Sequence, residues 1–125
     1  MSHKAKILLV DDEMDLLHGL KKNLRLLGFK VLTATSGGEA FELFMVHNFD
    51  LVITDMRMPN GDGLELLNNL RKIDSSIPVI CFITECSDQQ IQEVEKLGVV
   101  AMLSKPFELQ ELLNAINKGL NKKAI

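Results

Sequence analysis

The sequence KILLVDDE at residues 6–13 joins a short apolar run to three acidic residues. The run is rich in branched aliphatic side chains, which favour a strand buried on both faces of a parallel sheet. The pattern returns at residues 51–55, LVITD, where an apolar run ends in Asp55. Similar runs lie at residues 31–34, 79–83 and 100–103. The sequence therefore predicts five buried strands.

Helical spacing and helix-ending signals lie between these runs. One stripe of leucines is formed by Leu17, Leu20, Leu24 and Leu27, and a second apolar stripe by Leu109, Leu112, Leu113, Ile116 and Leu120. Residues 36–39 and 87–90 each begin with a serine and end with Glu or Gln, the spacing of a capping box. Gly28 and Gly98 follow helical stretches, where glycine commonly ends a helix. Strands and helices are thus predicted to alternate.

This alternation predicts the fold class. Short connections between successive strands and helices imply parallel strands, right-handed crossovers and helices on both faces of the sheet. We expect a three-layer α/β sandwich of the flavodoxin-like (βα)5 type, with strand order 2-1-3-4-5. The chain of 125 residues has the length of one domain. We place that domain at residues 5–121, with frayed ends at 1–4 and 122–125.

Composition excludes several classes of protein. The chain is 46% hydrophobic and 25% charged, as in globular proteins, and its net charge of -3 does not favour direct binding of nucleic acid. No apolar run approaches the roughly 18 to 20 residues needed to span a bilayer. Cys81 and Cys86 lack the repeated pairs or nearby histidines of a zinc site, so we interpret them as buried or incidental thiols. The expected location is the cytoplasm, without a membrane partner.

Candidate chemistry lies where the predicted strands end. Ligands of open parallel sheets bind beyond the carboxyl ends of the strands. Asp11 and Asp12 end the first strand, Asp55 ends the third, and Lys105 follows the fifth. One such aspartate alone is more often a helix cap or turn residue, but caps do not require carboxylates on two strands and a lysine beyond a third. Clustered carboxylates need a cation, and oxygen ligands favour Mg²⁺ (or Mn²⁺) over zinc.

These residues resemble the receiver domains of two-component response regulators, of which the chemotaxis regulators are examples. The resemblance covers Ala5 to about Leu120 and is carried by residues 7–13 (ILLVDDE), 49–59 (FDLVITDMRMP) with Gly63 after them, and 105–107 (KPF). It implies a phosphoacceptor switch rather than an enzyme, with only self-catalysed phosphorylation and slow autodephosphorylation. The implied acceptor is Asp55, and the implied donor is a histidine kinase, a phosphotransfer protein or a small phosphodonor.

The resemblance also implies how each residue acts. Asp12, Asp55 and the backbone carbonyl of Arg57 would bind Mg²⁺ directly, and Asp11 would bind it through a water molecule. Lys105 would contact a phosphoryl oxygen as a point charge. The implied output is a conformational change on the face formed by the fourth helix, fifth strand and fifth helix. A downstream output domain or protein, or a second copy in a phosphorylation-dependent homodimer, would read this change.

Two further family positions involve a Thr or Ser at the end of the fourth strand and an aromatic residue on the fifth strand. Counting without gaps from Pro78, and back from Lys105, places Ile83 at the hydroxyl position. A bulge at the strand end would instead bring Thr84 there, and this is the assignment we favour. Met102 occupies the aromatic switch position.

Three other functions fit parts of the pattern. The first is a pseudo-receiver that binds a partner without being phosphorylated. The second is a magnesium-dependent phosphohydrolase, but such enzymes commonly carry two aspartates one residue apart, whereas Asp11 and Asp12 are adjacent. The third is a flavin-binding electron carrier, which requires a phosphate-cradling loop where this chain has acidic residues.

Overall fold

The computed structural model describes residues 5–57 and 63–124, in which five parallel strands alternate with five helices. The strands are β1 (Lys6–Val10), β2 (Lys30–Ala34), β3 (Leu51–Asp55), β4 (Val79–Ile83) and β5 (Ala101–Ser104). The helices are α1 (Met14–Leu26), α2 (Gly37–Val46), α3 (Gly63–Ile73), α4 (Asp88–Lys96) and α5 (Leu109–Ala124). The sheet has the order β2-β1-β3-β4-β5, which confirms the predicted flavodoxin-like fold.

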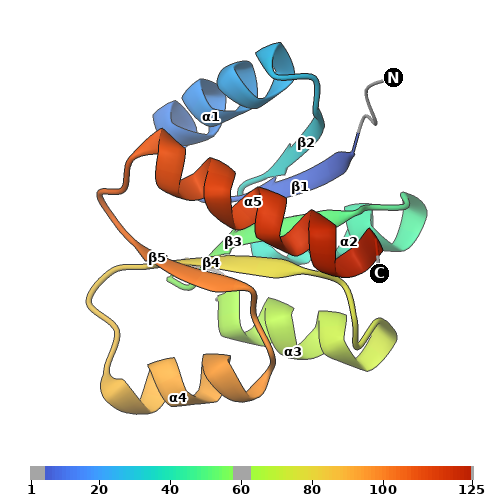
Figure 1. The fold of residues 1–125 in the computed structure, drawn as a ribbon. Coiled ribbons are helices and arrows are strands. Elements are labelled where there is room, and N and C mark those ends of the chain that lie inside the picture. The colour runs from blue at the N-terminus through green and yellow to red at the C-terminus, as the bar shows by residue number, and fades with distance from the viewer. Residues whose placement is uncertain (1–4, 58–62, 125) are drawn as a thin grey trace.

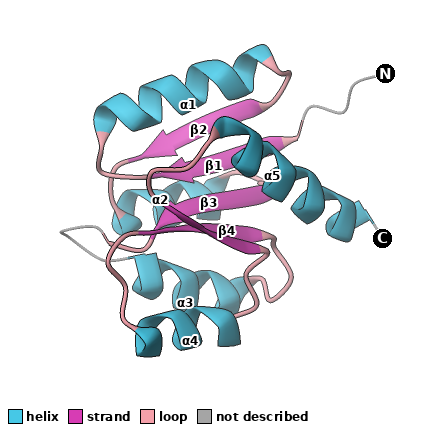
Figure 2. Ribbon diagram, turned by 60° about the vertical axis from the view of Figure 1, so that its left-hand side comes forward, coloured by secondary structure: helices cyan, strands magenta, loops and turns pink. Residues whose placement is uncertain are grey.

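The helices cover both faces of the sheet. In Figure 1, α5 lies in front of the strands and α2 behind them, and Figure 2 shows α3 and α4 together beyond β4. One core cluster packs α1 and α5 against one face, through residues such as Leu17, Leu24 and Ile116. The other packs α2, α3 and α4 against the opposite face, through residues such as Ala40 and Leu67. The arrangement is the predicted three-layer sandwich.

Two serines begin helices as the sequence predicted. Ser87 and Gln90 form a complete capping box, in which Gln90 N donates to Ser87 Oγ at 3.1 Å and Ser87 N donates to Gln90 Oε1 at 2.9 Å. At α2, Ser36 Oγ accepts from the N–H of Glu39 at 3.2 Å. The Glu39 carboxylate accepts from the N–H of Thr35, one residue before the cap. Both serines satisfy backbone donors that a helix start leaves free.

The end of α1 departs from the apolar stripe that the sequence predicted. Leu17 and Leu24 are buried, as predicted, but Leu27, expected on the same stripe, is 55% exposed. Leu27 is the C-cap, and the chain turns away from the helix axis at Gly28, whose φ of +99° is readily adopted only by glycine. Gly98 ends α4 in the same way, with a φ of +73°.

Helix α5 continues to the end of the described residues. The backbone is helical to Ala124, beyond residue 121, where the sequence predicted the ordered domain to end. Residues 1–4, predicted to be frayed, lie outside the described residues. Within the described part of the chain, no helix is long and apolar enough to cross a membrane.

Candidate functional site

Three aspartates meet at the carboxyl edge of the sheet. Asp11 and Asp12 follow β1, and Asp55 is the last residue of β3, which pairs with β1 in parallel. One carboxylate oxygen from each of the three lies within 4.8 Å of the others. Asp11 and Asp55 are buried, at 0% and 4% exposure, whereas Asp12 is exposed. The structure thus brings together the acidic residues that the sequence placed on separate strands.

Lys105 places its ammonium group among these carboxylates. Its Nζ lies 2.7 Å from Asp11 Oδ2, 2.7 Å from Glu13 Oε1 and 2.8 Å from Asp55 Oδ2. The backbone of Lys105 continues the line of β5, since its N–H donates to the carbonyl of Ile83 at 3.0 Å. The ammonium is therefore delivered to the acidic edge by the end of a strand, as predicted.

Burial and charge together set the protonation of this cluster. Burial raises the pKa of Asp11, and the contacts with the Lys105 ammonium and the N–H of Glu13 offset part of that rise. Burial would lower the pKa of Lys105, but contacts with Asp11, Asp55 and Glu13 outweigh it and raise that pKa. Lys105 consequently remains a cation, and it partly compensates the buried acids.

The oxygen atoms and the charge of the cluster suit a cation. Asp11 Oδ1 accepts from the N–H of Glu13 at 2.9 Å, and Asp55 Oδ1 accepts from the N–H of Arg57 at 3.0 Å. Asp11 Oδ2 is buried and, among the described residues, its close polar neighbour is the Lys105 ammonium. One ammonium faces more than one negative charge here, and all the clustered donors are oxygen. This donor set fits a hard divalent ion such as Mg²⁺.

Gly63 allows the edge to be this compact. A Cβ at Gly63 would lie 1.9 Å from the carbonyl oxygen of Asp55 and 2.8 Å from Met56 Cα. Its N–H also donates to the carbonyl of Met56 at 3.2 Å, which ties the start of α3 to the segment after β3. Only a residue without a side chain permits this approach. Met58 and Pro59, which belong to the same motif, lie outside the described residues.

The end of β4 is regular and contains no bulge among its described residues. β4 pairs without interruption with β3 up to Asp55 opposite Phe82, and with β5 up to Ile83 opposite Ser104. Ile83 is the last strand residue and lines a small hollow with Met56 and Arg57. The bulge expected from the sequence is therefore absent, because β4 is held in register from both sides.

Thr84 and Met102 are not arranged as the hydroxyl and the aromatic ring of a coupled switch would be. Thr84 is exposed in the loop after β4, and Glu85 next to it has a φ of 50°. Met102 is half-buried and packs, like Ile83, against the core on the α2, α3 and α4 side. The assignment of Thr84 as the switch hydroxyl remains a prediction.

Sequence reasoning missed two contributors to the site. Glu13 received no role, although its carboxylate contacts Lys105; its place as the third acid of DDE was the available signal. Phe82 was not singled out either. Its ring stacks on Phe107 with centroids 4.5 Å apart, and Lys105 Nζ lies 5.8 Å from the Phe82 centroid. The Lys105 ammonium therefore lies near a stacked aromatic pair, in which Phe82 comes from β4 and Phe107 from the segment after β5.

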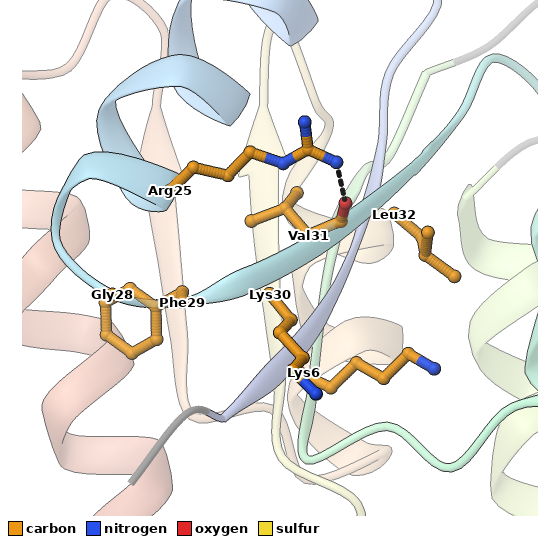
Figure 3. Close-up of a pocket in the computed structure, with 7 residues that line it drawn as sticks. All are labelled: Lys6, Arg25, Gly28, Phe29, Lys30, Val31 and Leu32. Carbon is orange, nitrogen blue, oxygen red and sulfur yellow. Dashed lines mark hydrogen bonds between the residues drawn. The ribbon is translucent and has the colours of Figure 1, made fainter. Parts of the chain in front are cut away.

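A larger hollow lies at the opposite end of the sheet and is basic. It has a volume of about 390 Å³ and includes Lys6 and Lys30, the first residues of β1 and β2. Figure 3 shows these lysines with Arg25, whose guanidinium donates to the carbonyl of Val31 at 3.4 Å. Its position at the amino ends of the strands separates it from the acidic edge. The candidate site is therefore the carboxyl edge.

Known proteins are similar to this chain in sequence and in fold. A model of the family described as the response regulator receiver domain matches residues 7–117. The transcriptional regulatory protein GlrR of Escherichia coli (strain K12) is 37% identical over 125 residues, 99% of this chain and 28% of GlrR. The sporulation initiation phosphotransferase F of Bacillus subtilis (strain 168) is 33% identical over 119 residues, 95% of this chain and 96% of that protein. The chain spans less than a third of GlrR.

Solved structures agree. A CheY-like receiver domain protein from Methanospirillum hungatei JF-1 has a TM-score of 0.93 and 26% identity, and covers 98% of both chains. A receiver domain protein from Clostridium thermocellum has a TM-score of 0.89 and 36% identity, and covers 96% of this chain and 97% of that one. The chain belongs to the response regulator receiver domain family, the signalling modules of two-component systems. Membership supports a phosphoacceptor role and an acidic pocket compatible with Mg²⁺.

Proposed function

We propose that this chain is a phosphoacceptor switch whose acceptor is Asp55. The observation that carries the proposal is the surroundings of the Asp55 carboxylate. It is 4% exposed, it accepts from the Lys105 ammonium at 2.8 Å, and two further carboxylates lie within 4.8 Å of it. A carboxylate held in this way is oriented as a nucleophile, and the cation beside it can stabilise charge on a transferring phosphoryl group.

The proposed reaction is transfer of a phosphoryl group from a phosphohistidine or a small phosphodonor. A carboxylate oxygen of Asp55 forms a bond to phosphorus, and the bond from phosphorus to the donor atom breaks. The electron pair remains on that atom, which is the imidazole nitrogen of a phosphohistidine or the acetate oxygen of acetyl phosphate. Hydrolysis later returns the carboxylate and inorganic phosphate. Positioning and electrostatic stabilisation account for the catalysis in a transfer of this kind. Lys105 is the residue that would contact a phosphoryl oxygen.

A divalent metal belongs to this proposal. Asp12, Asp55 and the backbone carbonyl of Arg57 would hold Mg²⁺ or Mn²⁺ directly, and Asp11 would do so through water. The ion would supply positive charge that offsets the repulsion between the acidic cluster and an incoming phosphoryl group. Lys105, paired with Asp11, keeps the Asp55 carboxylate oriented at the same edge.

The proposed output is a population shift on the face formed by α4, β5 and α5. Ile83 lines a hollow with Gln90 and Val94 of α4, and Met102 packs against the same core cluster as Ile83. Their apolar packing is the proposed route in place of a hydroxyl and an aromatic ring. The proposed partners are a histidine kinase or phosphotransfer protein, and a downstream output domain or protein. Homodimerisation on phosphorylation and action in the cytoplasm are part of the same proposal.

A second candidate is a pseudo-receiver, which binds a partner without being phosphorylated. The observation in its favour is the apolar pair Ile83 and Met102, together with the exposure of Thr84. A receiver without the hydroxyl would hold a phosphoryl group by one hydrogen bond fewer. The complete set of Asp11, Asp12, Asp55 and Lys105 favours the phosphoacceptor.

The test is the intact mass of the protein after incubation with acetyl phosphate. We expect a gain of about 80 Da in the wild type with Mg²⁺, the mass of one phosphoryl group. Asp55→Asn, which keeps the shape of the side chain, should show no gain, and EDTA should abolish the gain in the wild type. Circular dichroism of the variant verifies that it is folded. No gain under any condition, with Mg²⁺ binding still measurable, would favour the pseudo-receiver.

A further inference from the structure

The ammonium of Lys105 has three N–H donors and, in this structure, three carboxylate partners. The partners are Asp11 at 2.7 Å, Glu13 at 2.7 Å and Asp55 at 2.8 Å. A lysine ammonium offers no more than three donors. The contacts with Glu13 and Asp55 are hydrogen bonds, and the contact with Asp11 Oδ2 is an ion pair. A phosphoryl oxygen that enters this crowded first shell therefore competes with one of the three carboxylates.

The three partners differ in how readily they can be replaced. Asp11 is completely buried, so releasing it would leave a carboxylate without its cation in the interior. Asp55 is the group that carries the phosphoryl oxygen and stays next to Lys105 in any case. The Glu13 side chain is 62% exposed, so water can solvate its carboxylate after release. Glu13 is the partner whose replacement costs least.

The local structure at Glu13 gives its side chain no other use. Glu13 is the N-cap of α1, but its side chain makes no capping hydrogen bond. Ser, Thr, Asp and Asn are the residues that stabilise this position, and glutamate is not among them. The carboxylate extends instead to Lys105, the residue that follows β5. A helix requirement therefore does not explain this residue, whereas the contact with Lys105 does.

We infer that Glu13 is a positioning residue, which holds Lys105 in the phosphate-free state and is exchanged for a phosphoryl oxygen when Asp55 is modified. This inference rests on the proposed function and deepens it. Glu13 competes with the phosphoryl group for one N–H of Lys105. Its removal is expected to favour the phosphorylated state, unlike the removal of Asp11, Asp55 or Lys105.

The first measurement is the affinity for beryllofluoride, a phosphoryl mimic, in the presence of Mg²⁺. Because the ion pair is partly exposed, Glu13→Ala should tighten binding by about twofold to fivefold. The matched control is Asp15→Asn, which removes one negative charge from the first turn of the same helix at an exposed residue. If the effect were only long-range charge, both variants would change the affinity equally.

The second measurement requires neither metal nor phosphoryl group. Nitrogen-15 NMR of the Lys105 ammonium reports how fast its protons exchange with water. Exchange should be faster in Glu13→Ala than in the wild type, and it should be unchanged in Asp15→Asn. The rate in Glu13→Gln should lie between those of the wild type and Glu13→Ala, because an amide oxygen still accepts a hydrogen bond.

A third variant separates positioning from helix stability. Glu13→Ser provides a favourable N-cap, so it should raise the melting temperature of the protein by a few degrees. It should nevertheless release Lys105 and tighten beryllofluoride binding as Glu13→Ala does. If the role of Glu13 were merely structural, the affinity for beryllofluoride would follow the stability of the protein. The affinity would then change in opposite directions in Glu13→Ala and Glu13→Ser.

The outcomes distinguish this inference from the proposed function. Wild type that binds no beryllofluoride and gains no mass would overturn both. Wild type that binds, with Glu13→Ala equal to Asp15→Asn or weaker than wild type, would overturn the role of Glu13 alone. Tighter binding by Glu13→Ala and Glu13→Ser, with faster Lys105 exchange, would establish it.

Discussion

The acidic edge and the α4 region lie at neighbouring strand ends but are built differently. Every residue of β3 is buried, and its last residue, Asp55, is tied to Lys105 and to the N–H of Arg57. α4 has nine residues, of which only Val94 is buried. Its C-terminal end is held by Arg71, which donates to the carbonyls of Leu97 at 2.6 Å and Gly98 at 3.2 Å.

This difference teaches where the molecule is rigid and where it can move. Elements with few buried apolar contacts open at lower free energy than core strands. The site chemistry lies on core strands, which suits precise positioning. Arg71 holds the C-terminal end of α4, and near its other end Ile83, Cys86 and Gln90 line a small hollow. This difference supports the proposal that the switch involves α4, whose C-terminal end is held by Arg71.

Breaking the acidic edge should have the largest effect. Gly63→Ala would place a Cβ 1.9 Å from the carbonyl oxygen of Asp55, so the start of α3 must shift. We expect the free energy of unfolding to fall by about 3 kcal/mol. Gly19→Ala is the matched control, because nothing lies within 4 Å of its Cβ. In the middle of α1, this substitution should raise the free energy of unfolding by about 1 kcal/mol. Urea unfolding measures the stability of both variants. A higher free energy of unfolding in Gly63→Ala as well as in Gly19→Ala would contradict the close approach at Gly63.

Releasing the held end of α4 should have the next largest effect. Arg71 also donates to the carbonyl of Ile77 at 2.8 Å, so Arg71→Met removes several charge-assisted hydrogen bonds. We expect a loss of about 2 kcal/mol in urea unfolding, with faster amide hydrogen exchange in α4. Lys72→Met, at the exposed neighbouring residue, should change neither quantity. Unchanged exchange in α4 for Arg71→Met would show that another contact supports the helix.

Restoring a hydroxyl at the end of β4 sharpens the contrast between the two regions. Ile83→Thr adds a donor at the last strand residue, so it should tighten beryllofluoride binding about fivefold, the equivalent of one hydrogen bond of about 1 kcal/mol. Thr84→Ala is the companion variant, and an unchanged affinity would leave the hydroxyl position with Ile83. Weaker binding by Thr84→Ala would instead assign the switch hydroxyl to Thr84.

Thiol reactivity should show the smallest difference between strand and loop. Burial raises the pKa of Cys81 to about 12 from its usual 9.0, whereas Cys86 is half-buried after β4. At pH 8 we expect a thiol reagent to label Cys86 alone, and to label both cysteines in urea. Unfolded Cys81 ionises near pH 9 and folded Cys81 near 12, so its contribution to stability is lost as the pH rises through that window. Labelling of the folded Cys86→Ser variant would show that β4 opens.

The sequence predicted the strands and most of the site because both depend on local patterns. β4 has the predicted bounds, residues 79–83, and the acids were identified because they follow apolar runs. Parallel strands bring their carboxyl ends to one edge, so Asp11, Asp55 and Lys105 could be expected to meet. Leu27 could not be predicted correctly, because its exposure follows from the direction that the chain takes at Gly28.

By itself, the sequence determined the fold class and the residues that could carry chemistry, since strand periodicity, helix signals and the order of motifs are local properties. Only the tertiary structure decided three further points: the unbroken register that ends β4 at Ile83, the packing of Gly63 on the Asp55 carbonyl, and the contact of Glu13 with Lys105. Each depends on distances between segments far apart in the chain, which packing of the whole sheet sets.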